Sequence, residues 1–386
     1  MSVETLTLGC RLNFAESETI ARTAPESENW IVVNSCAVTN EAVRQTRQAI
    51  RRAHRQSPSA RILVTGCAAE LEPALFESLP GVHRVVGNAR KLSSIVANGV
   101  MAPAGFQGHV RSFVGVQSGC NHRCTFCSIW KARGPSRSLP FELIRDAVAR
   151  EIDRGAKEIV LTGVDITDYE NGLGLLCQAL LAAEPRLSRL RLSSLDGVEM
   201  DEALFDLIAG EPRLLPHFHL SLQAGDDLVL KRMKRRHSRR DAVRTVERIK
   251  AVRSDATIGA DLIAGFPTET EEMAVNSLKL LDDCDIVAAH VFPFSPRPDT
   301  PAERMPQLPR EIVKARALRL REAAARRRAR WLDGLIGSQL PVLIENKGKG
   351  HADNFAPVFI EGASRGGSGL ARVGGRSADQ LTASWI

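Results

Sequence analysis

The sequence of 386 residues contains no run of eighteen or more apolar residues, so no segment is expected to cross a membrane. Its N-terminus, MSVETLTLGC, has neither a basic region nor an apolar stretch, and the usual pattern of a secretory signal is therefore missing. No internal repeat appears. These absences, with ordinary shares of apolar (44%) and charged (25%) residues, predict a cytoplasmic protein with a full-sized core and two or three domains.

Short β-rich runs alternate with helical stretches in two successive regions. In the first region the runs ETLTLGC, NWIVVNSC, ARILVTGC and VHRVVGN, with a helix expected at 41–56, predict a small open parallel α/β sheet. From residue 110 the alternation restarts with KEIVLTG, RLRLSSL, HFHLSLQ, TIGADLIAG and AAHVFPF as strands and with helices near 143–154 and 240–252. These longer units predict a full or partial βα barrel, in which catalytic groups gather at the C-terminal ends of the strands.

Two breaks in this alternation divide the chain. The stretch 98–108, with Pro103 and several glycines, predicts a linker. A long helix is expected at 310–332, and the Gly-rich remainder predicts a small all-β module. We therefore expect an N-terminal parallel-sheet domain at 1–105, a central partial barrel with the long helix at 106–336, and the all-β module at 337–386.

Three of the eight cysteines lie close together in the segment Cys120-Asn-His-Arg-Cys124-Thr-Phe-Cys127. Thiolates are the preferred ligands of iron–sulfur clusters, and this spacing lets one loop wrap one face of a cubane cluster. Three ligands leave the fourth iron open to the amino and carboxyl groups of S-adenosylmethionine. A zinc site is the alternative, but structural zinc usually shows two paired motifs, and His122 lies inside the loop. The CxxxCxxC pattern thus resembles the radical S-adenosylmethionine superfamily.

Polar residues and glycines stand at or near the C-terminal ends of the expected barrel strands. Strand ends in such a barrel gather around one site, and glycine lets the backbone approach a ligand closely. Each of these residues alone is more often an ordinary loop residue, but together they favour a shared cofactor site. The candidates for cofactor binding are Gly163, Ser194, Gln223, Asp261 and Gly265.

A second set of three cysteines is spread along the N-terminal region. Cys10, Cys36 and Cys67 each close an expected strand, and the C-terminal ends of parallel strands share one edge of the sheet. A single cysteine there is commonly a small buried apolar residue, but three at equivalent positions indicate a second cluster site. Cys177 and Cys284 lack such partners, and we expect them to be structural.

These residues are similar to those of the radical S-adenosylmethionine methylthiotransferase family over nearly the whole chain. The similar features are Gly9-Cys10 with Asn13 and Glu16-Ser17, then Cys36, then Thr65-Gly66-Cys67, then the CxxxCxxC loop with Ala132-Arg133-Gly134, and a C-terminal module like the TRAM RNA-binding domain. The resemblance implies two 4Fe-4S clusters, one held by Cys10, Cys36 and Cys67 and one by Cys120, Cys124 and Cys127.

The resemblance also implies the chemistry. In this family the central cluster reductively cleaves S-adenosylmethionine to a 5′-deoxyadenosyl radical, which takes hydrogen from an inert C–H bond. The N-terminal cluster carries the sulfur, and a second S-adenosylmethionine supplies the methyl group. The protein positions these groups and excludes water. An electron donor such as a flavodoxin or ferredoxin is implied as a partner.

Branches of the family differ in substrate: isopentenyladenosine in tRNA, threonylcarbamoyladenosine in tRNA, and an aspartate of a small-subunit ribosomal protein. The segment CAVTNEA at 36–42 with Arg44 and Arg47, and HVFPFS at 290–295 with Arg297 and Thr300, are similar to the threonylcarbamoyladenosine branch. We therefore expect methylthiolation of N6-threonylcarbamoyladenosine next to the anticodon. The other two substrates remain alternatives.

Positive charge is concentrated in two segments. Residues 310–330 hold nine Lys/Arg against two Glu, and KRMKRRHSRR at 231–240 holds seven. One such run is usually a solvated face, but two beside a small β module favour contact with the phosphates of tRNA. Arg326, Arg327 and Arg328 are the candidate RNA-binding residues. A cluster-bearing RNA-binding or sensor protein without turnover is the non-enzymatic alternative, and the strand-end residues argue against it.

Overall fold

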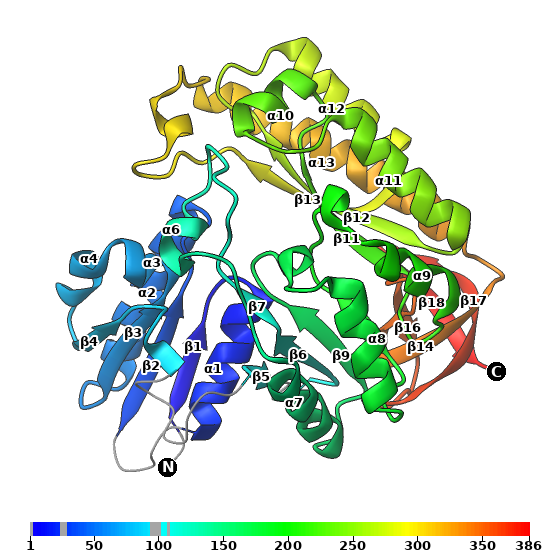
Figure 1. Cartoon of the computed structure of the whole chain (residues 1–386), viewed down its shortest axis with the longest axis horizontal. Coiled ribbons are helices and arrows are strands. Elements are labelled where there is room, and N and C mark those ends of the chain that lie inside the picture. The colour runs from blue at the N-terminus through cyan, green and yellow to red at the C-terminus, as the bar shows by residue number, and fades with distance from the viewer. Residues whose placement is uncertain (1–2, 24–28, 93–101, 106–108) are drawn as a thin grey trace.

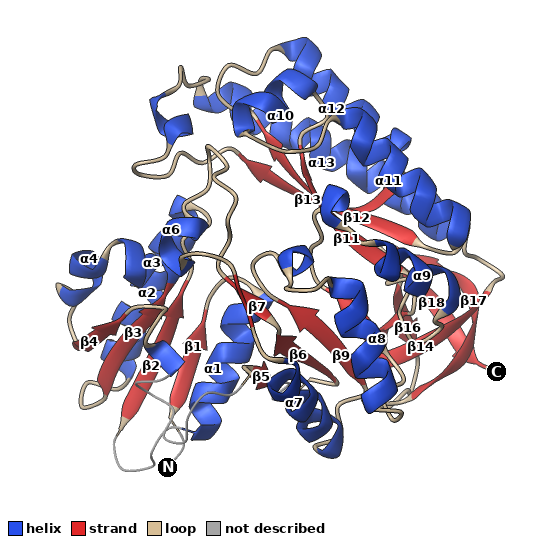
Figure 2. Ribbon diagram, in the orientation of Figure 1, coloured by secondary structure: helices blue, strands red, loops and turns tan. Residues whose placement is uncertain are grey.

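The structure is a computed structural model that describes residues 3–23, 29–92, 102–105 and 109–386. An N-terminal α/β sheet and a small C-terminal β-barrel flank a central partial barrel (Figures 1 and 2). This arrangement confirms the expected fold class. No helix in the described ranges is long and apolar enough to cross a membrane.

The N-terminal sheet is parallel throughout, in the order β1-β2-β3-β4. Its central strands form because each is a buried apolar run, which suits a parallel sheet covered on both faces. The side chain of Thr39 caps the long second helix by accepting from the N–H of Ala42. The elements are β1 (Glu4–Thr7), α1 (Arg11–Thr23), β2 (Trp30–Ser35), α2 (Asn40–Gln56), β3 (Arg61–Gly66), α3 (Cys67–Leu71), α4 (Pro73–Glu77) and β4 (Val82–Val86).

Within its described residues the central region carries six parallel strands, one more than was expected from the sequence. Two sheets, β10-β9-β6-β5 and β11-β12-β13, are joined by parallel bridges from Leu190 to Leu214 and from Leu195 to Leu220. The unexpected strand is β6, whose sequence RSFVG is too short and mixed to give a strand pattern. The parallel strands are β6 (Arg111–Gly115), β9 (Glu158–Thr162), β10 (Leu190–Leu192), β11 (His217–Gln223), β12 (Thr257–Ala264) and β13 (Ile286–Pro293).

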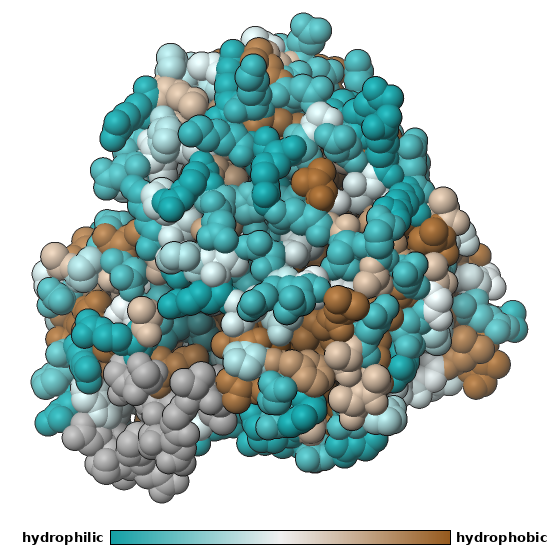
Figure 3. Space-filling model, in the orientation of Figure 1, coloured by the Kyte–Doolittle hydropathy of each residue, from teal (hydrophilic) through white to brown (hydrophobic). Residues whose placement is uncertain are grey.

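Helices cover the outer face of this partial barrel (Figures 1 and 2). The helices are α7 (Phe141–Asp153), α8 (Leu173–Ala183), α9 (Glu202–Gly210), α10 (Asp227–Met233), α11 (Arg239–Val252), α12 (Glu271–Asp283) and α13 (Arg310–Asp333). The short elements β7 (Gln117–Ser118), α6 (Ile129–Arg133) and β8 (Arg137–Ser138) frame the cysteine loop. Figure 3 shows apolar side chains scattered among hydrophilic ones on the face that it views.

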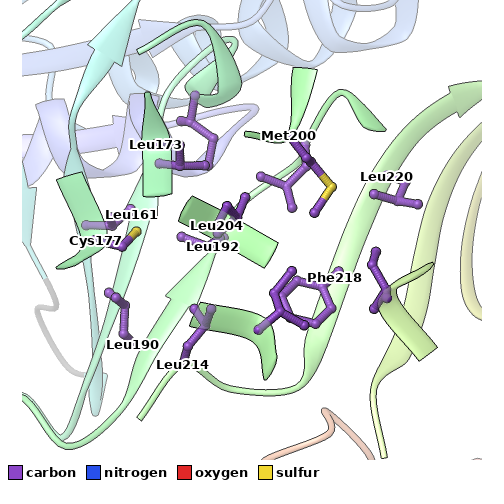
Figure 4. Packing of buried hydrophobic residues seen from close by; sticks show 14 of the residues in the cluster. Leu161, Leu173, Cys177, Leu190, Leu192, Met200, Leu204, Leu214, Phe218 and Leu220 are labelled. Carbon is purple, nitrogen blue, oxygen red and sulfur yellow. The ribbon is translucent and has the colours of Figure 1, made fainter. Parts of the chain in front are cut away.

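The outward-facing strand residues form one apolar core with these helices. Leu161, Leu192 and Phe218 from the strands pack with Leu204 of α9, as Figure 4 shows. Cys177 lies in the same core, and burial raises the pKa of its thiol. This position suits the structural role expected of Cys177.

The expected linker at 98–108 is only partly described. Of this stretch, 98–101 and 106–108 lie outside the described residues. Ala104 and Gly105 form the edge strand β5 (Ala104–Gly105), which pairs antiparallel with β6 and is buried. Helix α1 also packs on β5 and β6, and Thr19 exchanges hydrogen bonds with Ala104. The described part of this stretch is therefore part of the barrel sheet, and the boundary at residue 105 stays a prediction.

The C-terminal residues form a closed barrel in the order β14-β15-β16-β18-β17 around a core that includes Val342, Ile344 and Val358. A loop of this barrel docks on the N-terminal ends of the central strands. There Phe355 is stacked between His217 and His351, with ring centroids 4.8 and 4.5 Å away. The strands are β14 (Gln339–Asn346), β15 (Lys349–Ala352), β16 (Pro357–Ile360), β17 (Ser368–Ser377) and β18 (Gln380–Trp385).

Candidate active site

The core thiol set, Cys120, Cys124 and Cys127, lies on the loop between β7 and α6. The N–H of Cys127 donates to the carbonyl of Cys124 at 3.2 Å, and the N–H of Cys120 donates to the carbonyl of Gly134 at 3.1 Å. Burial raises the pKa of Cys120 to about 12 and that of Cys127 to about 11, and the neighbouring thiols contribute in the same direction. Metal binding would therefore have to displace protons from these thiols.

Gln117 anchors this loop to the C-terminal end of β9. Its side-chain N–H donates to the carbonyl of Gly119 at 2.8 Å, while its side-chain oxygen accepts from the N–H groups of Val164 and Asp165 at 3.1 and 2.9 Å. Gly163 adjoins Gln117, and a Cβ at position 163 would come within 2.8 Å of the backbone oxygen of Gln117. This close approach explains why glycine occupies the position.

Charged side chains surround the core thiol set in acid–base pairs. Asp165 accepts from the Cys120 thiol at 3.7 Å and faces His122 Nε2 at 2.9 Å. Arg235 donates to Cys124 Sγ at 3.7 Å and to Asp196 at 2.8 Å. Burial acts to raise the pKa of Asp165, but its contacts with His122 leave that pKa lowered. Groups of opposite charge are therefore paired around these thiols.

The five candidate cofactor residues lie at different positions along their strands. Ser194 follows β10, Gln223 ends β11 with φ 66°, and Gly265 follows β12 with φ +74°. Asp261 lies in the middle of β12 rather than at its end. A cofactor role for these residues and for Gly163 stays a prediction.

Asp261 has two partners that were not expected from the sequence. His219 Nε2 of β11 and His290 Nδ1 of β13 lie 3.0 and 3.1 Å from Asp261 Oδ1. Burial acts to raise the pKa of Asp261, but its hydrogen bonds with the two imidazoles hold that pKa well below the usual range. The alternation HFHLSLQ could have indicated that histidines of β11 face inward with Gln223.

The N-terminal thiol set, Cys10, Cys36 and Cys67, follows β1, β2 and β3. These strands are parallel neighbours, so the three residues meet at one edge of the sheet. The charges of Cys10 and Cys67 both influence the pKa of Cys36, which burial raises to about 11. Gly9 has φ +98°, and a Cβ there would lie 2.8 Å from Cys36 Sγ. The structure thus brings the three distant cysteines together.

Three buried charges adjoin the N-terminal thiol set. Glu16, Lys91 and Arg133 have exposed fractions of 4, 1 and 4%. Both cations contact Glu16, so this group carries one positive charge in excess. Although burial acts to raise the pKa of Glu16, the two cations bring it down to about 2. An anionic group on the neighbouring thiols would balance the excess charge.

The two thiol sets face each other across the boundary between the N-terminal sheet and the partial barrel. Helix α6 of the cysteine loop packs beside α3, which begins at Cys67 (Figure 1). Arg133 Nε donates to Cys67 Sγ at 3.4 Å, and the charge of Cys67 influences the pKa of Cys127. Two facing sets of three thiols, one beside excess positive charge, fit two iron–sulfur clusters.

The three candidate RNA-binding arginines on α13 differ in environment. Arg326 is exposed and Arg328 is half-buried. Arg327 forms ion pairs with Asp282 of α12 and with Asp285. Arg327 therefore has a structural role, whereas Arg326 remains the clearest candidate for a phosphate contact.

Comparison with known families gives two matches. Residues 114–281 match the radical SAM superfamily, and residues 2–87 match a family described as uncharacterized protein family UPF0004. The first range contains the core thiol set, and the second contains the N-terminal thiol set. Each thiol set thus lies within a separate family match.

Curated relatives match nearly the whole chain. A threonylcarbamoyladenosine tRNA methylthiotransferase of Rickettsia prowazekii is 42% identical, over 93% of this chain and 91% of the relative. A protein of the same name from Thermotoga maritima is 33% identical, over 88% and 85%. A tRNA-2-methylthio-N(6)-dimethylallyladenosine synthase of Erythrobacter litoralis is 31% identical, over 88% and 86%.

Among solved structures, the fold is similar to that of the radical S-adenosylmethionine methyltransferase TsrM from Kitasatospora setae. With cobalamin and a [4Fe-4S] cluster bound to that protein, the TM-score is 0.54 at 16% identity, over 74% of this chain and 65% of that chain. This similarity concerns the fold alone.

Proposed function

The chain belongs to the radical S-adenosylmethionine methylthiotransferase family, and on that premise we propose that it converts N6-threonylcarbamoyladenosine of tRNA, next to the anticodon, to its 2-methylthio derivative. The observation that carries the proposal is the 42% identity, along more than nine-tenths of both chains, to a relative named for this activity. The two facing thiol sets supply the metal ligands that such a reaction needs.

The clusters and S-adenosylmethionine, when bound, supply the electron transfer, the hydrogen abstraction, the sulfur and the methyl group. The chain's own residues hold and orient these groups. The core thiol set would hold the cluster that works with S-adenosylmethionine, whereas the N-terminal thiol set would hold the other cluster. Our candidates for holding the cofactor are Gly163, Ser194, Gln223, Asp261 and Gly265.

The inner face of the barrel suits a polar substituent on the target base. Asp261 is hydrogen-bonded there to both His219 and His290, and the His290 side chain is 60% exposed. A threonylcarbamoyl group carries a carboxylate, a hydroxyl and an amide-like unit, whereas a dimethylallyl group is apolar. Buried or half-buried polar groups need partners, so this face favours the threonylcarbamoyl substrate.

We also propose the setting of the reaction. The tRNA would be bound partly through α13, with Arg326 the first candidate. A flavodoxin or ferredoxin would deliver electrons to the cluster that the core thiol set holds. Because the proposed substrate is tRNA, we propose that the enzyme acts in the cytoplasm.

Deletion and complementation of the gene test the proposal. Digested tRNA and ribosomal proteins from the deletion strain are analysed by mass spectrometry. We expect threonylcarbamoyladenosine without its methylthio group, and restoration by the wild-type chain. Loss of the methylthio group from dimethylallyladenosine, or from a ribosomal aspartate, would contradict the proposal and identify the other substrate.

A further inference from the structure

We propose that Arg133 is a positioning residue that joins the two thiol sets and stabilises the reduced form of the cluster held by Cys10, Cys36 and Cys67. The inference rests on the proposed function, because it assumes a cluster at these three thiols. Arg133 belongs by sequence to the cysteine loop of the barrel, but its side chain reaches the N-terminal sheet.

The backbone of Arg133 is fixed to the core thiol set. Arg133 ends α6, and the N–H of Ile129 at the start of this helix donates to Cys127 Sγ at 3.3 Å. The next residue, Gly134, accepts from the N–H of Cys120 at 3.1 Å. A displacement of Arg133 would therefore displace the loop that carries the core thiols.

The guanidinium of Arg133 uses all of its five N–H donors. Nη1 donates to Glu16 Oε1 at 2.8 Å and to Ser118 Oγ at 3.3 Å. Nη2 donates to Glu16 Oε2 at 3.1 Å and to Asn13 Oδ1 at 2.6 Å. Nε donates to Cys67 Sγ at 3.4 Å. Lysine has three donors on one atom and cannot form this planar pattern.

The charge of Arg133 acts directly on Cys67. Glu16 neutralises only one of the two buried cations, Lys91 and Arg133, so positive charge remains beside this sulfur. A charged donor to a ligating sulfur stabilises added electron density on a cluster and so raises its reduction potential. Asn88 supports the contact, because its side-chain N–H donates to Ala132 O at 2.7 Å and to Cys67 Sγ at 3.7 Å.

The test uses the full chain with Cys120, Cys124 and Cys127 replaced by Ala, which retains the N-terminal cluster alone. Its reduction potential is measured by electron paramagnetic resonance during a redox titration. Adding Arg133→Gln should shift the potential to a more negative value, because a charge and a donor to sulfur are lost. Arg133→Lys keeps the charge but not the planar donors and should give a smaller shift in the same direction.

Lys131→Gln is the matched control, since Lys131 lies on the same helix, is exposed, and donates to the backbone oxygen of Asp299. This control should leave the potential unchanged. If Arg133→Gln loses its iron, Arg133→Lys decides the question, because it keeps the buried charge.

The outcomes separate the two proposals. If the variant with Cys120, Cys124 and Cys127 replaced by Ala holds no cluster at all, both the proposed function and the inference are contradicted. A cluster that keeps the same potential when Arg133→Gln is added to this variant, or when Arg133→Lys is added if Arg133→Gln holds no iron, would overturn the role of Arg133 alone.

Discussion

The two thiol sets differ in how the chain assembles them and in the charges beside them. The core thiol set comes from one loop, and its charged neighbours lie in pairs such as His122 with Asp165 and Arg235 with Asp196. The N-terminal thiol set comes from three strand ends, and its buried neighbours carry an excess positive charge. We infer that the N-terminal site favours a more anionic group, while the core site can accept the cationic sulfonium of S-adenosylmethionine.

The largest expected effect concerns iron. The anaerobically prepared chain should hold about eight irons in two clusters, since each thiol set can carry one four-iron cluster. Replacement of either set by Ala should remove about half of the iron. Iron analysis with Mössbauer spectroscopy measures this, and loss of all iron on replacement of one set would contradict the proposed function with its two separate clusters.

The next effect concerns the buried charge at the N-terminal thiol set. Glu16→Gln would leave Lys91 and Arg133 buried without their carboxylate, and breaking such a buried pair costs about 3–5 kcal/mol in the free energy of unfolding. Denaturant unfolding of the chain measures it. Glu202→Gln is the control, because Glu202 pairs with Arg248 on the surface, and no measurable change is expected there.

The stabilising effect of Glu16 should depend on pH. Its folded pKa of about 2 lies below the ordinary value of about 4.3 for an unfolded glutamate. The stabilisation is therefore fully present above the unfolded pKa and is lost as the pH falls toward 2. The difference in unfolding free energy between wild type and Glu16→Gln should shrink steadily below pH 4. A difference that stays constant from pH 5 to pH 3 would contradict the pairing.

A smaller effect is expected where the C-terminal barrel docks. Phe355→Ala removes the half-buried ring that stacks on His217 and His351 and should destabilise the chain by about 2 kcal/mol, less than the loss of a fully buried Phe. Thermal unfolding of the whole chain measures it. Separate melting of the C-terminal barrel in the wild type would show that this contact carries little energy.

The smallest effect concerns tRNA. Arg326→Gln should lower the slope of log affinity against log salt by about one unit or less, as expected for one lost phosphate contact. Arg327→Gln should leave the slope unchanged and reduce stability instead, because Arg327 is paired with Asp282 and Asp285. Equal changes in slope for both variants would show that the ion pairs do not hold Arg327 in place.

Much of this arrangement could be predicted from local patterns. The loop of Cys120, Cys124 and Cys127 is visible in the sequence because its ligands are close together. Cys10, Cys36 and Cys67 could be grouped because each closes a strand of one parallel sheet. The contact of Arg133 with Glu16 could not, because it joins residues 117 positions apart and depends on how two regions pack.

The same limit applies to Phe355 and Arg327. The Phe355 contact with His217 crosses from the C-terminal barrel to β11, and no local pattern indicates it. Removal of the residues from 337 onward would therefore expose the N-terminal ends of the central strands. Truncation is therefore a poorer test of tRNA binding than the single substitution at Arg326. For Arg327, the basic run indicated charge but not the acidic partners, Asp282 of α12 and Asp285.

One measurement tests the division of roles between the two thiol sets most directly. Release of 5′-deoxyadenosine and formation of methylthiolated nucleoside are measured together, for the chain lacking the core thiols and for the chain lacking the N-terminal thiols. We expect the chain without the core thiol set to form neither product. The chain without the N-terminal thiol set should release 5′-deoxyadenosine but form no methylthiolated nucleoside. Methylthiolated nucleoside at the wild-type rate in the second variant, or 5′-deoxyadenosine release in the first, would contradict this division of roles.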